Sequence, residues 1–281
     1  MTLLRPLDSI SLADAAECGG KAARLGEAMR LGCPVPKGIV LSTELYRRFM
    51  QQGGLLGEIA SILAAMQPTT MTHFQAAEWA IRSAFKVRRI PRVVADTIRE
   101  AYRTLDSQPI AVRSSATSED GFEQSFVGQH FSCLDVSSEE AAIAAVIQCW
   151  QSLFSAKALS YAHYFGVDLL TSSMAVLMQQ VIVPNSRGAL FTVDPITGNP
   201  DEFLLEVQEG PRLGLYRLDP YERQPGESRA WSQLRHIGLL LDEHERRYQT
   251  IEWGITESQV YILRVRPVTK VLPYLPPSLK P

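Results

Sequence analysis

The sequence predicts an α+β protein whose first part is rich in helices and whose second part is rich in strands. Two observations lead to this fold class. Before Ser173, apolar residues recur mainly at helical spacing, whereas after it they form short continuous runs typical of buried strands. With 281 residues, the chain is long enough for two lobes with substantial cores. We therefore expect an N-terminal lobe over 1–175, a C-terminal lobe over 176–270 and a proline-rich tail over 271–281.

In the first part, one short strand and several helices are expected. Residues 20–31 form the first helix, because Ala22 and Leu25 fall at helical spacing and Gly32 stops the pattern. A short buried strand follows over 38–41. Further helices are expected after a cap at Ser42 or Thr43, and over 54–66, 73–86 and 92–105.

A polar segment lies between two expected strands, at 110–112 and 130–136. It begins with Arg113 and continues with serines, threonine, acidic residues and two glycines. Hydroxyls, glycines and backbone N–H groups in a turn form a concave anion site, and a strand-end arginine adds a fixed charge with a bidentate fork. Together these groups suit phosphate oxygens. The alternative is a polar surface loop whose Ser and Thr side chains bond their own backbone.

The remaining segments complete the pattern of helices followed by strands. Ser137 or Ser138 is expected to cap an alanine-rich helix that continues through Phe154, and a second helix runs to Phe165. Buried strands are expected over 174–183, 188–193, 203–208 and 260–265.

Composition argues against several classes of protein. The formal net charge is −2 and the basic residues are spread out, so we expect no nucleic-acid binding. No run of 18 apolar residues is present, which predicts no transmembrane span. The four cysteines lack metal-ligand spacing and are interpreted as unpaired thiols of a cytoplasmic protein, with no zinc site.

A second segment also suits a phosphate. In Cys18-Gly-Gly-Lys21, a lysine follows two glycines at the expected start of a helix. Free N–H donors, the positive end of the helix dipole and a flexible point charge favour an anion there. The spacing is not that of a P-loop, because GxxxxGK[ST] is absent. The alternative is a solvent-facing lysine, although a helix N-terminus is a poor place for a cation without an anion nearby.

Longer motifs surround both cations. Gly19-Gly-Lys21-Ala and Ala111-Val-Arg113-Ser-Ser-Ala-Thr-Ser-Glu119-Asp120 resemble the nucleotide-binding domain of pyruvate phosphate dikinase. That domain is shared with phosphoenolpyruvate synthase and rifampicin phosphotransferase. Further similar motifs occur in the same order at Gly32-Cys-Pro34-Val35-Pro36, Ser125-Phe-Val-Gly128-Gln129, Trp150-Gln-Ser-Leu-Phe154, Phe191-Thr-Val-Asp194-Pro195-Ile-Thr-Gly198, Ile251-Glu252-Trp253 and Arg266-Pro267. The resemblance covers roughly residues 17–269.

The resemblance implies an ATP-grasp-like domain in which two lobes enclose ATP. It implies catalytic roles for Lys21, Arg113 and Arg266, all of which would also contact the phosphates. The loop containing Ser114, Thr117 and Gln129 would cover the phosphates. The remaining contacts implied are Gln179 and the backbone near Val181 at the adenine edge, Glu252 on Mg²⁺, and Arg264 as a further cofactor contact. Gln179 could instead be an edge-strand surface residue, and Glu252 could simply pair with a lysine or arginine.

The sequence departs from the family pattern where a metal is expected. Thr250 stands where the family has an acidic residue, and Arg264 replaces a glutamine that helps hold the metal. Mg²⁺ prefers oxygen ligands, which arginine cannot provide. Arg264 could neutralise phosphate charge in place of a metal, exclude the metal, or point outward as a surface side chain.

Two main functions follow from the resemblance. In the first, the protein cleaves ATP and passes phosphate to a small molecule or to a histidine. Because the 281 residues contain no counterpart of the family's swivelling histidine domain, that histidine is expected on a partner protein. In the second, prompted by Thr250 and Arg264, the protein is a non-catalytic or regulatory nucleotide-binding subunit. A scaffold that no longer binds nucleotide is a third alternative.

Overall fold

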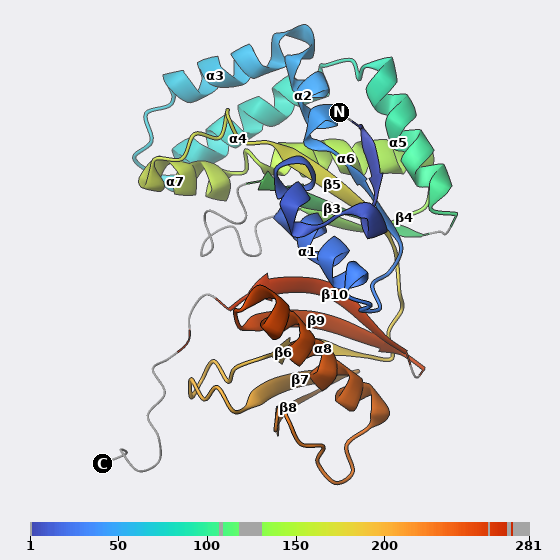
Figure 1. The fold of residues 1–281 in the computed structure, drawn as a ribbon. Helices are drawn as coiled ribbons and strands as arrows, with labels where there is room; N and C mark the ends of the chain where they lie inside the picture. Colours follow the sequence, from blue (N-terminus) through green and yellow to red (C-terminus); the bar gives the residue numbers. More distant parts are fainter. Residues whose placement is uncertain (1, 107–108, 118–130, 258, 269–270, 272–281) are drawn as a thin grey trace. The chain divides into compact units, whose positions relative to one another are not determined.

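The computed structural model describes residues 2–106, 109–117, 131–257, 259–268 and 271. The chain forms two compact units, shown in Figure 1. The first comprises Met1–Ala23 and Lys37–Val181, and the second comprises Arg24–Pro36 and Ile182–Pro281. The expected division after residue 175 falls inside a strand of the first unit, whereas the observed division follows Val181. Of the expected tail over 271–281, the structure describes Val271, and the other residues lie outside the described part of the chain.

The first unit contains a five-stranded antiparallel sheet in the order β1-β2-β5-β3-β4. Its strands are β1 (Leu4–Pro6), β2 (Gly38–Leu41), β3 (Ile110–Ala116), β4 (Ser132–Val136) and β5 (Met174–Gln180). The strand predicted over 38–41 is confirmed. The central strand is β5, which explains why six of its seven residues are buried.

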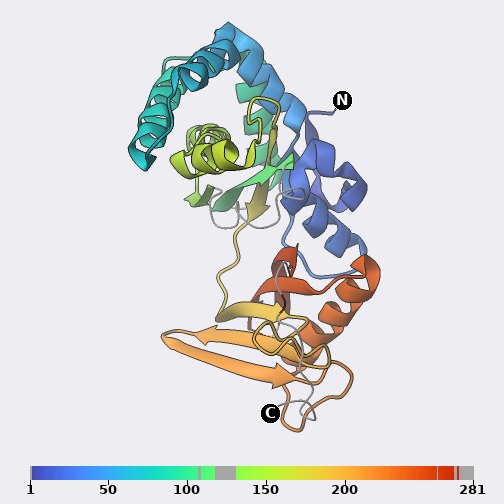
Figure 2. The same cartoon turned by 90° about the vertical axis from the view of Figure 1, so that its left-hand side faces the viewer.

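Helices supply most of the remaining core of this unit. Figure 2 shows the arrangement of these helices from a second side. They are α2 (Thr43–Gln51), α3 (Leu55–Ala65), α4 (Met71–Lys86), α5 (Arg92–Thr104), α6 (Glu139–Ser152) and α7 (Ala156–Phe165). The fully buried ring of Trp150 packs against Tyr46 and Phe49, with ring centroids 5.9 and 5.0 Å away. Alternate sheet residues such as Val112 and Val176 belong to the same core, so the helices cover one face of the sheet.

The helix starting after residue 138 is confirmed, with a correction to its length. Ser138 caps α6, because its hydroxyl accepts a hydrogen bond from the backbone N–H of Ala141 at 3.1 Å. The helix ends at Ser152, and Ser155 caps α7 as a separate helix. The span 139–165 is long and apolar enough to cross a membrane by length and composition alone. Its most apolar window is 67% buried, which identifies α6 and α7 as core helices of this unit.

The second unit contains another five-stranded antiparallel sheet, in the order β10-β9-β6-β7-β8. Its strands are β6 (Ser186–Phe191), β7 (Phe203–Glu209), β8 (Arg212–Leu218), β9 (Gln249–Thr256) and β10 (Gln259–Pro267). Helix α8 (Arg229–Glu245) covers one face, where the backbone of Gly238 lies close to Phe203, Leu190 and Thr192.

A segment from the N-terminal region also belongs to this unit. Its helical part, the end of α1 (Ala15–Arg30), forms an ion pair from Arg24 to Glu245 of α8. Glu27 lies 3.0 Å from the Nε2 atom of His244. The sequence predicts this segment as part of the first lobe, because local periodicity identifies a helix and carries no information about which sheet the helix will pack against.

Asp242 on α8 makes the stability of the second unit depend on pH. Burial raises the pKa of its carboxyl to about 7, although Thr192 donates a hydrogen bond to it at 2.6 Å. The unfolded chain binds this proton only near pH 3.8, so between about pH 4 and pH 7 the folded state binds more protons. The free energy of unfolding should therefore fall as the pH rises through this window.

Asp242→Asn tests this expectation, since an amide keeps a hydrogen-bond acceptor for Thr192 but does not titrate. Urea unfolding of both proteins from pH 4.5 to 8 would give the two slopes. The free energy of unfolding should decline less with rising pH in the variant than in the parent. Above pH 7, we expect the variant to be the more stable of the two. Identical slopes would show that Asp242 is not the group responsible.

Candidate functional site

The first group of site residues is built around a kink in α1. Gly19 interrupts the helix with φ 74° and ψ 158°, so Lys21 lies at the start of a second helical segment, as the sequence predicts. A Cβ atom placed on Gly19 would lie 2.1 Å from the carbonyl oxygen of Ser115. The glycine therefore lets the α1 backbone lie directly on the end of β3.

Ser115 fixes the start of this second segment from β3. Its hydroxyl oxygen accepts a hydrogen bond from the backbone N–H of Ala22 at 3.0 Å, and both residues are fully buried. A serine from a neighbouring strand thus does the work of a helix cap. The sequence alone does not indicate this role of Ser115, because nothing in the local pattern distinguishes a capping hydroxyl from its neighbours.

Lys21 is held at the same strand end. Its side chain is 7% exposed, and its Nζ atom donates to the carbonyl oxygen of Ser114 at 2.5 Å. The hydroxyl of Ser114 donates in turn to the carbonyl oxygen of Phe131 at 3.1 Å. The structure therefore brings Lys21 and Ser114 together, through the backbone oxygen of Ser114.

Arg113 is the fourth of the seven residues of β3, so the expectation that it stands at the end of this strand is wrong. Arg113 and Gln179 meet on the face of the first sheet opposite to the helical core. Ala111 stands opposite Gln179 in the β3–β5 ladder, so Arg113 is one step along the same face. An Nη atom of Arg113 donates to the Oε1 atom of Gln179 at 3.2 Å. Gln179 is 2% exposed on the central strand, so the alternative of an edge-strand surface residue is wrong.

Three further residues of the first unit are predicted to contact the nucleotide or to cover it. Thr117 ties the end of β3 to the chain before β5, because its backbone N–H and its hydroxyl donate to the carbonyl oxygen of Ser173 at 3.1 and 3.2 Å. Val181 is the last residue of the first unit. Gln129 lies outside the described residues, as does most of the hydroxyl-rich loop, 118–130.

In the second unit, one face of the β9–β10 ladder carries the residues where the sequence suggests phosphate or metal contacts. Glu252 stands opposite Arg264, and Thr250 stands opposite Arg266. Directly opposed residues project to the same side, as do residues two apart along a strand. The guanidinium of Arg264 lies 3.3 Å from the Oε1 atom of Glu252. Of the alternatives for Glu252, pairing with an arginine is the one that the structure contains.

The surroundings of Arg266 disfavour its positive charge. Burial lowers its pKa, the positive charge of Arg264 lowers it further, and Glu252 only partly opposes these effects. Within the described ranges, the side chain of Arg266 forms no hydrogen bond or ion pair. An anion placed at this face would therefore relieve repulsion between two guanidinium groups.

The donor set does not suit Mg²⁺. A magnesium ion takes oxygen ligands in near-octahedral geometry, usually with one or two carboxylates. Nowhere in the described part of the chain do three His, Cys, Asp or Glu side chains gather to hold a metal. Glu252 is the only carboxylate among the four residues on this face, and a cation already contacts it.

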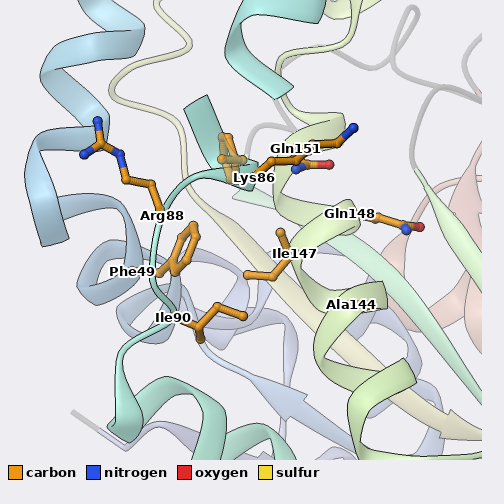
Figure 3. A pocket seen from close by; sticks show the side chains of 9 residues that line it. Phe49, Lys86, Arg88, Ile90, Ala144, Ile147, Gln148 and Gln151 are labelled. Atoms are coloured by element: carbon orange, nitrogen blue, oxygen red, sulfur yellow. The ribbon is translucent and has the colours of Figure 1, made fainter. Parts of the chain in front are cut away.

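A pocket of about 280 Å³ opens elsewhere in the first unit, near the end of α4 and the outer side of α6 (Figure 3). Phe49, Ile90 and Ile147 supply apolar walls, and Lys86 and Gln151 lie at one end. None of the site residues predicted from the sequence lines it. The pocket is thus separate from the Lys21–Arg113 group.

Comparison with known proteins bears on this arrangement. Residues 15–214 match the family described as pyruvate phosphate dikinase, AMP/ATP-binding domain. The chain belongs to this family. The matched range contains Lys21, Arg113 and Gln179, and it ends before β9 and β10. The family predicted from the motifs is therefore confirmed, and so is the α+β fold class, through the two antiparallel sheets and their helices.

Relatives include phosphoenolpyruvate synthase of Aeropyrum pernix, which is 39% identical over 217 residues, covering 75% of this chain and 26% of that protein. Rifampicin phosphotransferase of a Streptomyces species is 29% identical over 314 residues, covering 96% of this chain and 36% of that protein. The chain thus spans about a quarter to a third of these relatives. Among solved structures, D-alanine–D-alanine ligase of Helicobacter pylori matches with a TM-score of 0.32 and 13% identity, over 85% of this chain and 48% of that chain.

Proposed function

We propose that the protein is the ATP-binding domain of a dikinase-type phosphotransferase. It binds ATP, cleaves it, and passes phosphate to a small molecule or to a histidine on a partner protein. The observation that carries this proposal is the Lys21–Ser114–Arg113 group on β3, inside the range matched by the AMP/ATP-binding family. A cytoplasmic location stays a prediction.

The present contacts of the two cations support a phosphate role. Lys21 donates to the backbone carbonyl of Ser114, Arg113 donates to the side-chain amide of Gln179, and both of these acceptors are neutral. A phosphate oxygen carries charge and forms a hydrogen bond about twice as strong as a neutral acceptor does. A phosphate oxygen of ATP would therefore be a stronger acceptor than either of these two groups. Phosphoryl transfer depends mainly on positioning and charge neutralisation, which two cations held by one strand provide.

The other predicted residues have narrower proposed roles. Gln179 and the backbone near Val181 would contact the adenine edge, and Gln179 also holds Arg113 in position. Ser114 and Thr117 would support the loop that covers the phosphates, and Gln129 would act from that loop. Arg266 is proposed to contact the phosphates from the second unit.

A second candidate function is a nucleotide-binding subunit without turnover. The observation that favours it is the contact between Arg264 and Glu252, which leaves the described residues without a set of magnesium ligands. Incubation with labelled ATP separates the candidates, because the first predicts release of AMP or ADP and the second predicts bound, intact ATP.

Nucleotide binding itself is tested by calorimetry with Lys21→Met and Arg113→Gln. Each variant should bind ATP about tenfold more weakly or worse, because a hydrogen bond to a charged group contributes about 1.5–3 kcal/mol. Lys157→Met is the matched control, since Lys157 is an exposed lysine on α7 of the same unit. Melting curves without ATP would show that the variants are folded. Wild-type affinity in both site variants would contradict the proposal.

A further inference from the structure

The face of β9 and β10 opposite to α8 has an excess of positive charge. Arg264 and Arg266 contribute two positive charges and Glu252 contributes one negative charge, while Thr250 is neutral. Thr250 is 4% exposed, so it adds little polar surface to this face. The contact at 3.3 Å makes Glu252 a support for Arg264, which stays partly exposed.

A β-bulge is what puts both arginines on this face. Ile262 stands opposite Trp253, but the next paired residue, Arg264, stands opposite Glu252, so Leu263 is an extra residue in β10. Without it, Arg264 would stand opposite Ile251, which is fully buried on the face that α8 covers. A one-residue shift moves every side chain of a strand to the other face. The bulge therefore turns a buried, unfavourable position into a cationic surface.

We propose that this face binds the phosphates of ATP directly through Arg264 and Arg266, with no divalent metal ion between protein and nucleotide. The inference rests on the proposed function, and it names the ligand as metal-free ATP. Arginine forks match phosphate oxygens in a bidentate manner, and two of them can neutralise charge that a divalent ion otherwise carries. Arg264 also repels a metal cation and occupies the carboxylate that would hold it.

Calorimetry with ATP in EDTA and in excess Mg²⁺ tests the inference on the full chain. We expect wild-type protein to bind at least as tightly in EDTA as in Mg²⁺. Arg264→Gln should lose about ten- to a hundredfold of the affinity measured in EDTA, because one charged hydrogen-bonding group is removed. The same variant frees Glu252 and adds an amide oxygen, so Mg²⁺ should restore part of its affinity.

A double variant and a control sharpen the result. Arg264→Gln combined with Thr250→Asp places two carboxylates and an amide oxygen on one face, and it should bind ATP only when Mg²⁺ is present. Arg212→Gln makes the same charge change on the exposed strand β8 and should leave binding unchanged. Wild-type binding that requires Mg²⁺ would overturn the inference and leave the proposed function intact. Absence of ATP binding in both buffers would instead overturn the proposed function.

Discussion

Replacing Gly19 by alanine should destabilise the first unit by several kcal/mol and abolish ATP binding. The new Cβ atom would lie 2.1 Å from the carbonyl oxygen of Ser115 and 2.4 Å from its hydroxyl oxygen. That carbonyl belongs to a strand paired on both sides, so it cannot move without disturbing the sheet. The positive φ of Gly19 adds about 1–2 kcal/mol for any residue with a side chain.

Denaturant unfolding of Gly19→Ala and of a matched glycine variant would measure this effect. A Cβ atom added to Gly57 on α3 would have no neighbour within 4 Å, and the φ of Gly57 lies outside the left-handed region. Gly57→Ala should therefore stabilise the protein, by about 1 kcal/mol, through helix propensity. A Gly19→Ala protein with the unfolding midpoint of the parent would show that α1 does not rest on β3 as described.

Asp194→Ala should have the next largest effect on stability. The side chain is fully buried and accepts hydrogen bonds from the backbone N–H groups of Ile196 and Thr197, at 2.8 and 3.3 Å. Arg217 donates to its other oxygen at 3.1 Å. Each buried donor left without an acceptor costs about 1–3 kcal/mol, so we expect a total loss of several kcal/mol. Asp194 thus holds the turn of the Asp-Pro-Ile-Thr-Gly motif.

The pH dependence of Asp194 gives a second readout. Burial alone would raise the pKa of this carboxyl, but the hydrogen bonds from Ile196, Arg217 and Thr197 outweigh burial and hold the pKa below its usual value. The stability that it contributes is therefore present above the unfolded pKa of 3.8 and lost as the pH falls through the lower folded pKa. The gap in unfolding free energy between the parent and Asp194→Ala should narrow in acid. Asp201→Ala, at an exposed position nearby, is the control. An equal loss of unfolding free energy in that variant would contradict the role given to Asp194.

Local patterns were sufficient for much of the fold. The strand at 38–41 and the helices α3, α4 and α5 were predicted within a few residues, because their apolar residues recur with the period of the element. Helix α8 and strands β8 and β9 were not predicted. Most of β8 is exposed, so it lacks the alternation of buried and exposed residues that identifies a strand.

In the candidate site too, the sequence predicts what depends on neighbouring residues and misses what depends on contacts between distant segments. Local residue types suggested an anion site at Lys21 and Arg113, and the resemblance of the surrounding motifs led to their prediction as phosphate contacts. The bulge at Leu263 depends on pairing between two strands, so the sequence left open whether Arg264 faces inward or outward. The capping role of Ser115 depends on a close approach between α1 and β3, which local periodicity does not encode.

The central claim is that Lys21 and Arg113, which β3 brings together, bind the phosphates of ATP. A crystal structure with a non-hydrolysable ATP analogue tests it most directly. The account predicts phosphate oxygens within hydrogen-bond distance, about 2.7–3.2 Å, of the Lys21 Nζ atom and the Arg113 guanidinium. Lys21 would then have left the carbonyl of Ser114, which it contacts now. An analogue bound at another place, such as the pocket beside Lys86, with both cations still on their present partners, would contradict the account.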